Sequence, residues 1–317
     1  MGERPLVMSC GDPSGIGPEI AAKAWDAVGR ECPFVWLGDP QHLPEGVAFR
    51  VVDDVADCGG DVLPVVPVSF AAQARAGHPD PANAAGVIDA IRRGAELVQS
   101  GAARGLVTCP IHKAALKAGA GFGFPGHTEY LAHLAGVDRV VMMLASDALR
   151  VVPVTIHIPL ADVPKALTPD LLEATIRITH AALIRDFGIA RPRLAVAGLN
   201  PHAGEDGTMG LEDREVIAPV IARLCAEGMD LRGPLPADTM FHGPARARYD
   251  AALCMYHDQA LIPIKTLAFD EGVNVTLGLT FVRTSPDHGT AYDIAGQDVA
   301  RPDSLIAAIR MAWEMGA

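Results

Sequence analysis

The 317-residue sequence predicts an α/β fold with two α/β/α domains around mostly parallel sheets. Short runs that are apolar on both faces alternate with longer segments of helical spacing, and this alternation is typical of parallel β-α-β units. The length corresponds to about two domains at ~150 residues each. Half of the residues are hydrophobic and a fifth are charged, which excludes disorder and supplies a core without disulfides or metal staples.

Seven apolar runs are predicted to be buried strands, namely residues 6–10, 34–37, 106–109, 140–144, 151–156, 194–197 and 251–255. Between them, residues 82–101, 168–188 and 211–228 show helical spacing. In the second of these segments Thr168 is the expected N-cap, Pro169 the first helical residue and Gly188 the stop.

Composition marks no domain boundary, so glycine-rich segments indicate where the chain passes between domains. Residues 119–126 are the best first crossing and residues 267–273 the best return. We therefore expect residues 1–125 plus 268–317 to form one domain and residues 126–267 the other.

The charge balance argues against a nucleic-acid partner. The net charge is −12 and no cluster of Lys and Arg offsets it, although a small anionic substrate needs only two or three cations. Six cysteines are scattered without a CxxC pair, which predicts buried thiols in a reducing compartment. No apolar run reaches ~18 residues and residues 1–5 lack the features of a signal peptide, so we expect a cytoplasmic protein without membrane contact.

A glycine-rich turn, residues 11–19 (GDPSGIGPE), follows the first strand and opens a helix. Such a turn lets backbone N–H groups approach an anion. Ile20 stands where a Rossmann fingerprint needs Gly or Ala, and no Gly-Lys-Ser/Thr follows, so neither common phosphate motif is present. A structural turn and a ligand loop both remain open. The GxGxxG at residues 121–126 follows no strand and carries Pro125, so we reject it as a dinucleotide site.

Three histidines follow predicted strands: His157, His202 and His257. Parallel strand ends share one edge of a sheet, so three imidazoles there would suit a catalytic divalent metal with one open position. The alternative is three separately satisfied histidines, because no HExxH-like spacing is present.

A second set of polar residues lies in apolar or turn contexts. These residues are His127, Thr128, Lys265, Asn274 and Arg283. Together they would hold a phosphate through charge-assisted hydrogen bonds. The alternative for Lys265 and Arg283, each considered alone, is an ordinary surface charge.

In order along the chain, these segments resemble the 4-hydroxythreonine-4-phosphate dehydrogenase family of vitamin B6 synthesis. The matching motifs are residues 11–19, 110–113 (PIHK), 126–129 (GHTE), 155–157 (TIH), 198–205 (GLNPHAGE), 233–239 (GPLPADT), 255–259 (MYHDQ) and 283–291 (RTSPDHGTA). The resemblance implies a fold similar to isocitrate and isopropylmalate dehydrogenases. The nucleotide-binding domain would be residues 1–125 plus 268–317, and residues 126–267 would bind metal and substrate and form the dimer.

The resemblance also implies the site residues. Metal ligands would be His157, His202 and His257, and substrate contacts His127, Thr128, Lys265, Asn274 and Arg283. Residues 288–296 look like a nucleotide loop, with Tyr292 where proline is usual. An NAD or NADP site would then use Gly11, Asp12, His288, Gly289, Thr290 and Asp293. The family further implies a homodimer with active sites at the subunit interface, and one divalent ion (Zn, Mg or Co) per site.

The implied reaction is NAD(P)-dependent oxidation of 4-phosphohydroxy-L-threonine, followed by decarboxylation to 3-amino-2-oxopropyl phosphate. Asp238, Asp258 and Lys265 are the candidate catalytic groups. Asp238 and Asp258 would accept a proton or orient a ligand, with ordinary surface aspartate as the alternative. A dehydrogenase of erythronate or threonate 4-phosphate or of an aromatic cis-dihydrodiol, a metal-dependent phosphatase or phosphoacyl transferase, and a non-catalytic phosphometabolite-binding protein remain as alternative functions.

Overall fold

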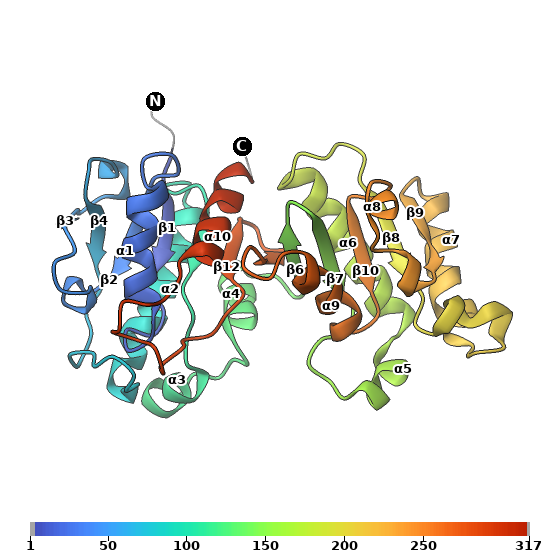
Figure 1. Ribbon diagram of the computed structural model, residues 1–317, viewed down its shortest axis with the longest axis horizontal. Coiled ribbons are helices and arrows are strands. Elements are labelled where there is room, and N and C mark those ends of the chain that lie inside the picture. Colours follow the sequence, from blue (N-terminus) through green and yellow to red (C-terminus); the bar gives the residue numbers. More distant parts are fainter. Residues whose placement is uncertain (1–3, 316–317) are drawn as a thin grey trace. The chain divides into compact units, whose positions relative to one another are not determined.

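The computed structural model describes residues 4–315, which divide into two compact units (Figure 1). Unit 1 ends at Val140 and resumes at Leu279, and unit 2 lies between them. The chain therefore leaves unit 1 once and returns once. Both crossings lie later than the predicted ones at 125/126 and 267/268.

Unit 1 contains a sheet in the order β3-β4-β2-β1-β5-β12, in which every pair of neighbours is parallel. Its strands are β1 (Leu6–Ser9), β2 (Phe34–Gly38), β3 (Phe49–Val51), β4 (Leu63–Pro67), β5 (Leu106–Thr108) and β12 (Arg283–Pro286). All residues of β1, β2 and β5 are buried, because helices cover both faces of a parallel sheet.

The helices of unit 1 are α1 (Gly17–Val28), α2 (Ala84–Gln99), α3 (Lys113–Ala120), α4 (His127–Ala135) and α10 (Asp303–Glu314). Helices α1 and α10 pack side by side, and α2 contacts β1, β2 and β5 (Figure 1). Helix α4 packs against α2, and Tyr130 of α4 lies edge-on to Phe122 at 5.2 Å between ring centroids. These contacts keep residues 126–140 in unit 1.

In unit 1 the sheet reverses its strand order at β1, which lies between β2 and β5. Loops after the two strands that flank such a switch point diverge and leave a crevice at the carboxyl ends of the strands. Here these are the loop of residues 10–16 after β1 and the loop of residues 109–112 after β5. The fold therefore positions the glycine-rich turn where open α/β sheets bind ligands.

Unit 2 contains a sheet in the order β11-β6-β7-β10-β8-β9. Its strands are β6 (Val141–Ser146), β7 (Leu149–Pro153), β8 (Arg193–Ala197), β9 (Asp230–Leu235), β10 (Ala251–Cys254) and β11 (Val273–Leu277). The β7-β10-β8-β9 pairs are parallel, whereas β6 is antiparallel to both β7 and β11. The two-residue connection of β6 and β7 permits only antiparallel pairing, and the pairing of β11 with β6 keeps residues 268–278 in unit 2.

The helices of unit 2 are α5 (Val163–Ala166), α6 (Pro169–Arg185), α7 (Ala218–Ala226), α8 (Gly243–Arg246) and α9 (His257–Leu267). A π-helical turn at Asp213–Ile217 precedes α7. Helix α6 begins as the sequence predicts, because the Thr168 hydroxyl accepts a hydrogen bond from the Leu171 N–H at 3.2 Å.

The prediction of an α/β fold with mostly parallel sheets is confirmed. All seven predicted strands exist, with ends that differ by a few residues from the predictions. All six cysteines are free thiols. Within residues 4–315, none of the helices combines the length and the apolar character that crossing a membrane requires.

Candidate active site

The turn after β1 is built on glycines that no other residue could replace without strain. Gly11 has φ +71°, and a Cβ there would lie 2.4 Å from the Pro110 carbonyl oxygen. A Cβ on Gly15 would lie 2.8 Å from the Thr290 carbonyl oxygen, which instead accepts a hydrogen bond from the Ile16 N–H at 3.0 Å. Three loops, after β1, after β5 and after β12, therefore meet through backbone contacts at the switch point.

Asp12 holds these loops together and is only 5% exposed. Its Oδ1 accepts a hydrogen bond from the Ser14 N–H at 2.9 Å, and its Oδ2 accepts one from the Tyr292 hydroxyl at 2.9 Å. Burial and the neighbouring Asp12 carboxylate raise the pKa of Tyr292, so the phenol stays protonated and donates. Asp12 is also a predicted cofactor contact, and in the structure each of its oxygens accepts one hydrogen bond from a protein donor.

The loop after β12 presents groups that suit a polar ligand. His288 Nδ1 lies 3.0 Å from the Gly289 carbonyl oxygen, which makes Nδ1 the protonated nitrogen and leaves Nε2 as an acceptor. That Nε2 is buried and has no hydrogen-bond partner among the described residues. Gly289 and Asp293 are exposed, and apart from its chain neighbours no described residue has an atom within 4 Å of the Cβ position of Gly289. An orphaned acceptor, open backbone and a carboxylate fit the hydroxyls and amides of a dinucleotide.

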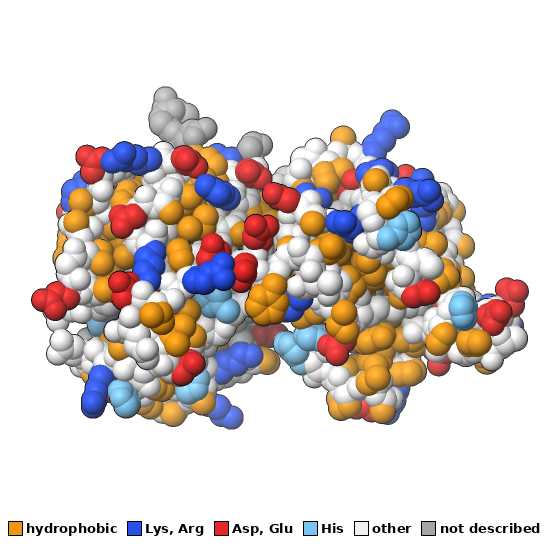
Figure 2. Space-filling model, viewed as in Figure 1, with side chains coloured by type: hydrophobic (Ala, Val, Ile, Leu, Met, Phe, Trp, Pro, Cys, Tyr) orange, Lys and Arg blue, Asp and Glu red, His pale blue; other side chains and the backbone are white. Residues whose placement is uncertain are grey.

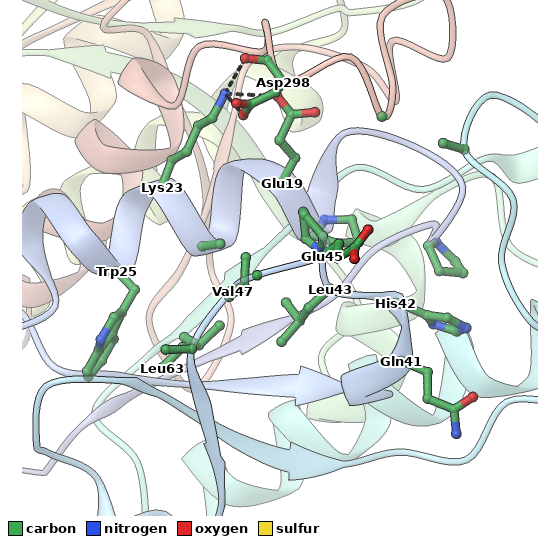
Figure 3. Close-up of a pocket in the computed structure, with 18 of the residues that line it drawn as sticks. Glu19, Lys23, Trp25, Gln41, His42, Leu43, Glu45, Val47, Leu63 and Asp298 are labelled. Carbon is green, nitrogen blue, oxygen red and sulfur yellow. Dashed lines mark hydrogen bonds and ion pairs between the residues drawn. The ribbon is translucent and has the colours of Figure 1, made fainter.

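A cavity of about 920 Å³ lies beside α1 in unit 1, near the far end of the same loop (Figure 3). The Lys23 ammonium on its wall lies 2.9 Å from Glu19 Oε1 and 3.0 Å from Asp298 Oδ1, and it also donates to the carbonyl of Ala300. Figure 3 shows the Lys23, Glu19 and Asp298 side chains converging on one side of the cavity. Lys23 therefore ties the end of the loop after β12 to α1.

Unit 1 also gathers cationic and neutral donors around the start of α4. Arg283 is 3% exposed, and its Nη2 donates to Thr108 Oγ1 at 2.6 Å. Burial lowers the pKa of Arg283 to about 10, which still leaves it charged at neutral pH. Burial, and then the charges of Arg283 and Lys113, hold the pKa of His127 well below its ordinary value, so its imidazole is neutral.

Lys113 is a member of this cluster that the sequence showed only as part of a motif. Its Nζ would lie 3.4 Å from a Cβ on Gly126, the residue before α4. The Nε2 of His127 is buried without a hydrogen-bond partner among residues 4–315. A buried guanidinium, an exposed lysine ammonium, an orphaned imidazole nitrogen and a helix N-terminus are groups that can bind a phosphate monoester. Thr128 follows His127 in the first turn of α4 and is half-buried.

Two of the five predicted substrate contacts belong to unit 2. Lys265 lies on α9, with its ammonium 5.5 Å from the centre of the Phe269 ring, and Asn274 lies on β11 opposite Leu144. The structure thus brings His127 and Arg283 into one cluster and places Lys265 and Asn274 on neighbouring elements of the other unit.

His157 and His257 form a pair in unit 2. Their ring centroids are 5.7 Å apart, and the Thr155 hydroxyl donates to the Met255 carbonyl at 2.7 Å, which ties the segment carrying His157 to the end of β10. Asp258 Oδ1 lies 2.7 Å from His257 Nδ1. A carboxylate on one ring nitrogen is the usual arrangement when the other ring nitrogen binds a metal, so two imidazoles of this kind are compatible with part of the donor set of a divalent ion. If His257 bound an ion, Asp258 would orient its ring.

His202 lies on a separate turn and does not join that pair. In the described part of the chain, no group of three His, Cys, Asp or Glu residues is spaced to hold an ion. The backbone of residues 202–206 is left-handed throughout, with φ between 42° and 80°. Each non-glycine residue in this conformation costs roughly 1–2 kcal/mol, and such residues usually occur singly. Asp238, the remaining catalytic candidate, is exposed in the short helix Ala237–Thr239.

Two α/β units with mostly parallel sheets, one of them with a switch point at β1, place the chain in the class of open α/β proteins, which bind ligands beyond the carboxyl ends of their strands. A family model described as "Pyridoxal phosphate biosynthetic protein PdxA" matches residues 30–312. The chain belongs to this PdxA family.

Relatives and solved structures agree with this assignment. The 4-hydroxythreonine-4-phosphate dehydrogenase of Paracoccus denitrificans (strain Pd 1222) is 65% identical over 319 residues, covering 99% of this chain and 98% of the relative. The crystal structure of 4-hydroxythreonine-4-phosphate dehydrogenase from Klebsiella pneumoniae has a TM-score of 0.91 and 35% identity, and the match covers 98% of each chain. A terephthalate 1,2-cis-dihydrodiol dehydrogenase from Burkholderia xenovorans LB400 has a TM-score of 0.70 and 29% identity, covering 99% of this chain and 98% of that one.

Proposed function

We propose that this chain is an NAD(P)-dependent, divalent-metal-assisted 4-hydroxythreonine-4-phosphate dehydrogenase. Its substrate would be 4-phosphohydroxy-L-threonine, oxidised at the C3 hydroxyl. The resulting ketone is β to the carboxylate, and acids of this kind lose CO₂ readily, which leaves 3-amino-2-oxopropyl phosphate. The observation that carries the proposal for this chain is the cluster of Arg283, Lys113 and neutral His127, which suits a phosphate ester.

The phosphate would be held far from the reacting carbon and would orient the substrate. Arg283 is fixed by burial and by its hydrogen bond to Thr108, so its guanidinium is already placed before a ligand arrives. His127 and Thr128 would add donors at the start of α4, and Lys265 and Asn274 would contribute from unit 2.

The cofactor would be held by His288, Gly289, Thr290 and Asp293, with Gly11 allowing close approach at the switch point. When bound, the nicotinamide of NAD or NADP accepts the hydride that leaves the substrate carbon. The orphaned Nε2 of His288 supports this proposal, because a buried acceptor without a partner is costly until a ligand supplies one.

The metal would be held by His157, His202 and His257. Because His202 does not join the His157–His257 pair within one described chain, this set would be completed across the subunit interface proposed below. When bound, a divalent ion such as Zn²⁺, Mg²⁺ or Co²⁺ supplies Lewis-acid chemistry that lowers the pKa of an alcohol and polarises a ketone. Asp258 would keep the His257 ring in one orientation. Asp238 and Lys265 are the two remaining candidates for a general base. The Asp238 carboxylate could accept the hydroxyl proton directly, whereas Lys265 could do so only as the neutral amine.

We also propose a homodimer with active sites at the subunit interface, in the cytoplasm. Each candidate ligand turn carries exposed apolar side chains: Leu160 (68% exposed) after His157, Met209 (45%) after His202 and Ile262 (63%) after His257. Figure 2 shows hydrophobic atoms gathered on the surface around α5, close in sequence to Leu160. Apolar side chains around a set of ligands are typical of a surface covered by a partner, and a second copy would supply the donors that complete the ion site.

Two variants test the proposal in an assay of NAD⁺ or NADP⁺ reduction at 340 nm. His202→Ala should abolish turnover and remove the bound metal, because it deletes one of three ligands. Arg283→Ala should mainly raise the KM for the phosphate ester. Full activity of a metal-free His202→Ala variant would refute the metal site, and an unchanged KM in Arg283→Ala would refute the phosphate site.

A second candidate function rests on the 29% identity to a dihydrodiol dehydrogenase. A substrate screen with and without chelator separates the candidates. Preference for an aromatic cis-dihydrodiol, or for erythronate or threonate 4-phosphate, would move this chain to a sister activity. Turnover without nucleotide would indicate a phosphatase or acyl transferase.

A further inference from the structure

The segment that carries His202 has a backbone that its own residues do not favour. His202, Ala203, Gly204, Glu205 and Asp206 all have positive φ, so four of these five consecutive residues are L-residues in the left-handed conformation. Such a run persists only where the surrounding structure determines it. Some group outside the run must therefore hold it.

Asp213 is a buried side chain that accepts hydrogen bonds from the residues just before this run. It is 1% exposed, and it begins the π-helical turn that precedes α7. Its Oδ1 accepts a hydrogen bond from the Leu199 N–H at 2.8 Å, and its Oδ2 accepts hydrogen bonds from the Asn200 N–H at 3.1 Å and the Asn200 side-chain amide at 2.9 Å. Three N–H donors from the two residues that enter the His202 turn thus converge on one carboxylate.

Two glycines make room for that carboxylate. A Cβ on Gly198 would lie 2.6 Å from Asp213 Oδ1, and a Cβ on Gly204 would lie 3.2 Å from Oδ2. The backbone therefore wraps the carboxylate from both ends of the segment, before and within the left-handed run. Because the carboxylate fits closely between these two glycines, it restricts the direction in which the backbone of the turn runs, and it also stabilises the turn.

Gln259 joins this turn to the second ligand-bearing segment. Its Oε1 accepts a hydrogen bond from the Met255 N–H at 2.6 Å, and its Nε2 donates to the Gly198 carbonyl at 2.8 Å. Gln259 lies two residues after His257 on the first turn of α9. Its side chain therefore ties the start of the His202 turn to the segment that carries His257.

We propose that Asp213 is a positioning residue that sets the presentation of the His202 imidazole to a divalent metal, with Gln259 linking that turn to His257. This inference rests on the proposed function, because it takes His202 as a metal ligand. Groups that orient metal ligands typically change metal affinity 10–100-fold when they are altered. Asp213 acts through the backbone of the turn and does not itself touch the ion.

Asp213→Asn tests the proposal, with Glu212→Gln as the matched control. Glu212 accepts a hydrogen bond from the same Asn200 amide at 2.8 Å but none from the backbone N–H groups that enter the turn. The Asn variant keeps the size of the side chain, yet its amide nitrogen must face an N–H donor. We expect the Kd for Co²⁺, measured by calorimetric titration of the full chain, to rise about 10–100-fold in Asp213→Asn. In Glu212→Gln the Kd should change by much less than tenfold, because Glu212 bonds only the Asn200 side chain.

The visible absorption of bound Co²⁺ adds a readout that a purely structural role would not move. A changed spectrum in Asp213→Asn, with melting that stays cooperative, supports a displaced ligand. Should Asp213→Asn fail to fold, Gln259→Met removes both bridging hydrogen bonds, and it should weaken Co²⁺ binding in the same direction.

Three outcomes separate this inference from the function on which it rests. If the unmodified chain does not bind Co²⁺, the metal site itself is refuted, and the role of Asp213 with it. If the unmodified chain binds Co²⁺ and Asp213→Asn binds it with equal affinity and an identical spectrum, only the positioning role is refuted. Where Asp213→Asn does not fold, unchanged affinity in Gln259→Met refutes it.

Discussion

Replacing Tyr292 by Phe isolates one hydrogen bond that joins the loop after β12 to the turn after β1. The phenol donates to Asp12 Oδ2 at 2.9 Å, and Asp12 is 5% exposed, so the variant leaves a buried charged oxygen without that donor. Hydrogen bonds to charged groups contribute about 1.5–3 kcal/mol. Because Tyr292 itself is half-buried and water can replace part of the bond, we expect the lower end of that range.

The loss of the Tyr292–Asp12 hydrogen bond should appear largely as weaker binding of the nucleotide. If about 1.4 kcal/mol of the bond energy serves to keep the loop in its binding conformation, the Kd for NAD⁺ or NADP⁺ rises about tenfold. Calorimetric titration of nucleotide into the purified chain measures this directly, and the KM for nucleotide should follow.

Tyr249→Phe is the matched control. The Tyr249 hydroxyl donates to the Met240 carbonyl at 2.9 Å in unit 2, so this variant also loses one phenolic hydrogen bond. It should lower the melting temperature without changing the Kd for nucleotide. Equal nucleotide affinity in Tyr292→Phe and the unmodified chain would refute the reasoning, and so would equal losses in both variants.

Three other perturbations have defined outcomes. Lys113→Ala should raise the KM for the phosphate ester about tenfold while the KM for nucleotide stays unchanged, and an unchanged ester KM would remove Lys113 from the phosphate cluster. Ile262→Glu should shift the chain towards monomer in sedimentation velocity and weaken metal binding, and a variant that still dimerises would contradict an interface at α9. Burial disfavours the Asp250 carboxylate, but hydrogen bonds and charge from Arg193 prevail and lower its pKa, so its stabilisation is present above the unfolded pKa near 4 and is lost as pH falls through the lower folded pKa. Asp250→Asn should therefore melt below the unmodified chain at pH 6 and approach it below about pH 4, and a pH-independent difference would exclude this assignment.

The seven predicted strands were recognisable because they are apolar on both faces, as in β1 and β8. Strands β4, β11 and β12 are also largely buried but were missed, because prolines or polar residues interrupt their apolar runs. Strand β3 escaped prediction because all three of its residues are exposed, and β9 because only Leu231 of its six residues is buried. Such strands form through backbone pairing with a neighbour, which a hydrophobic pattern does not report. The predicted crossings between units were misplaced because a local glycine-rich sequence does not report tertiary packing. Helix α4 follows the glycines at 119–126, but it packs on α2 and so belongs to unit 1.

Part of the candidate site was also visible in the sequence. Strand ends correctly indicated that His157 and His257 come together, because β7 and β10 are parallel neighbours. They did not indicate the left-handed turn at His202, since its only local signals are Gly204 and Gly207 and its conformation depends on Asp213 eleven residues away. The metal, substrate and cofactor assignments stay predictions until ligands are measured.

Unit 2 is one continuous stretch of chain, whereas unit 1 is completed only by residues that follow it. Strand β12 pairs with β5, and α10 packs on β12 and α1, so a nascent chain leaves the β5 edge of unit 1 unpaired until residues 283–286, which follow unit 2, have been made. The strands of unit 2 can therefore pair with one another before unit 1 is complete, whereas N-terminal domains usually fold first during translation. Arg283 lies on β12, so the cluster around α4 gains its buried cation only after unit 2 has been made.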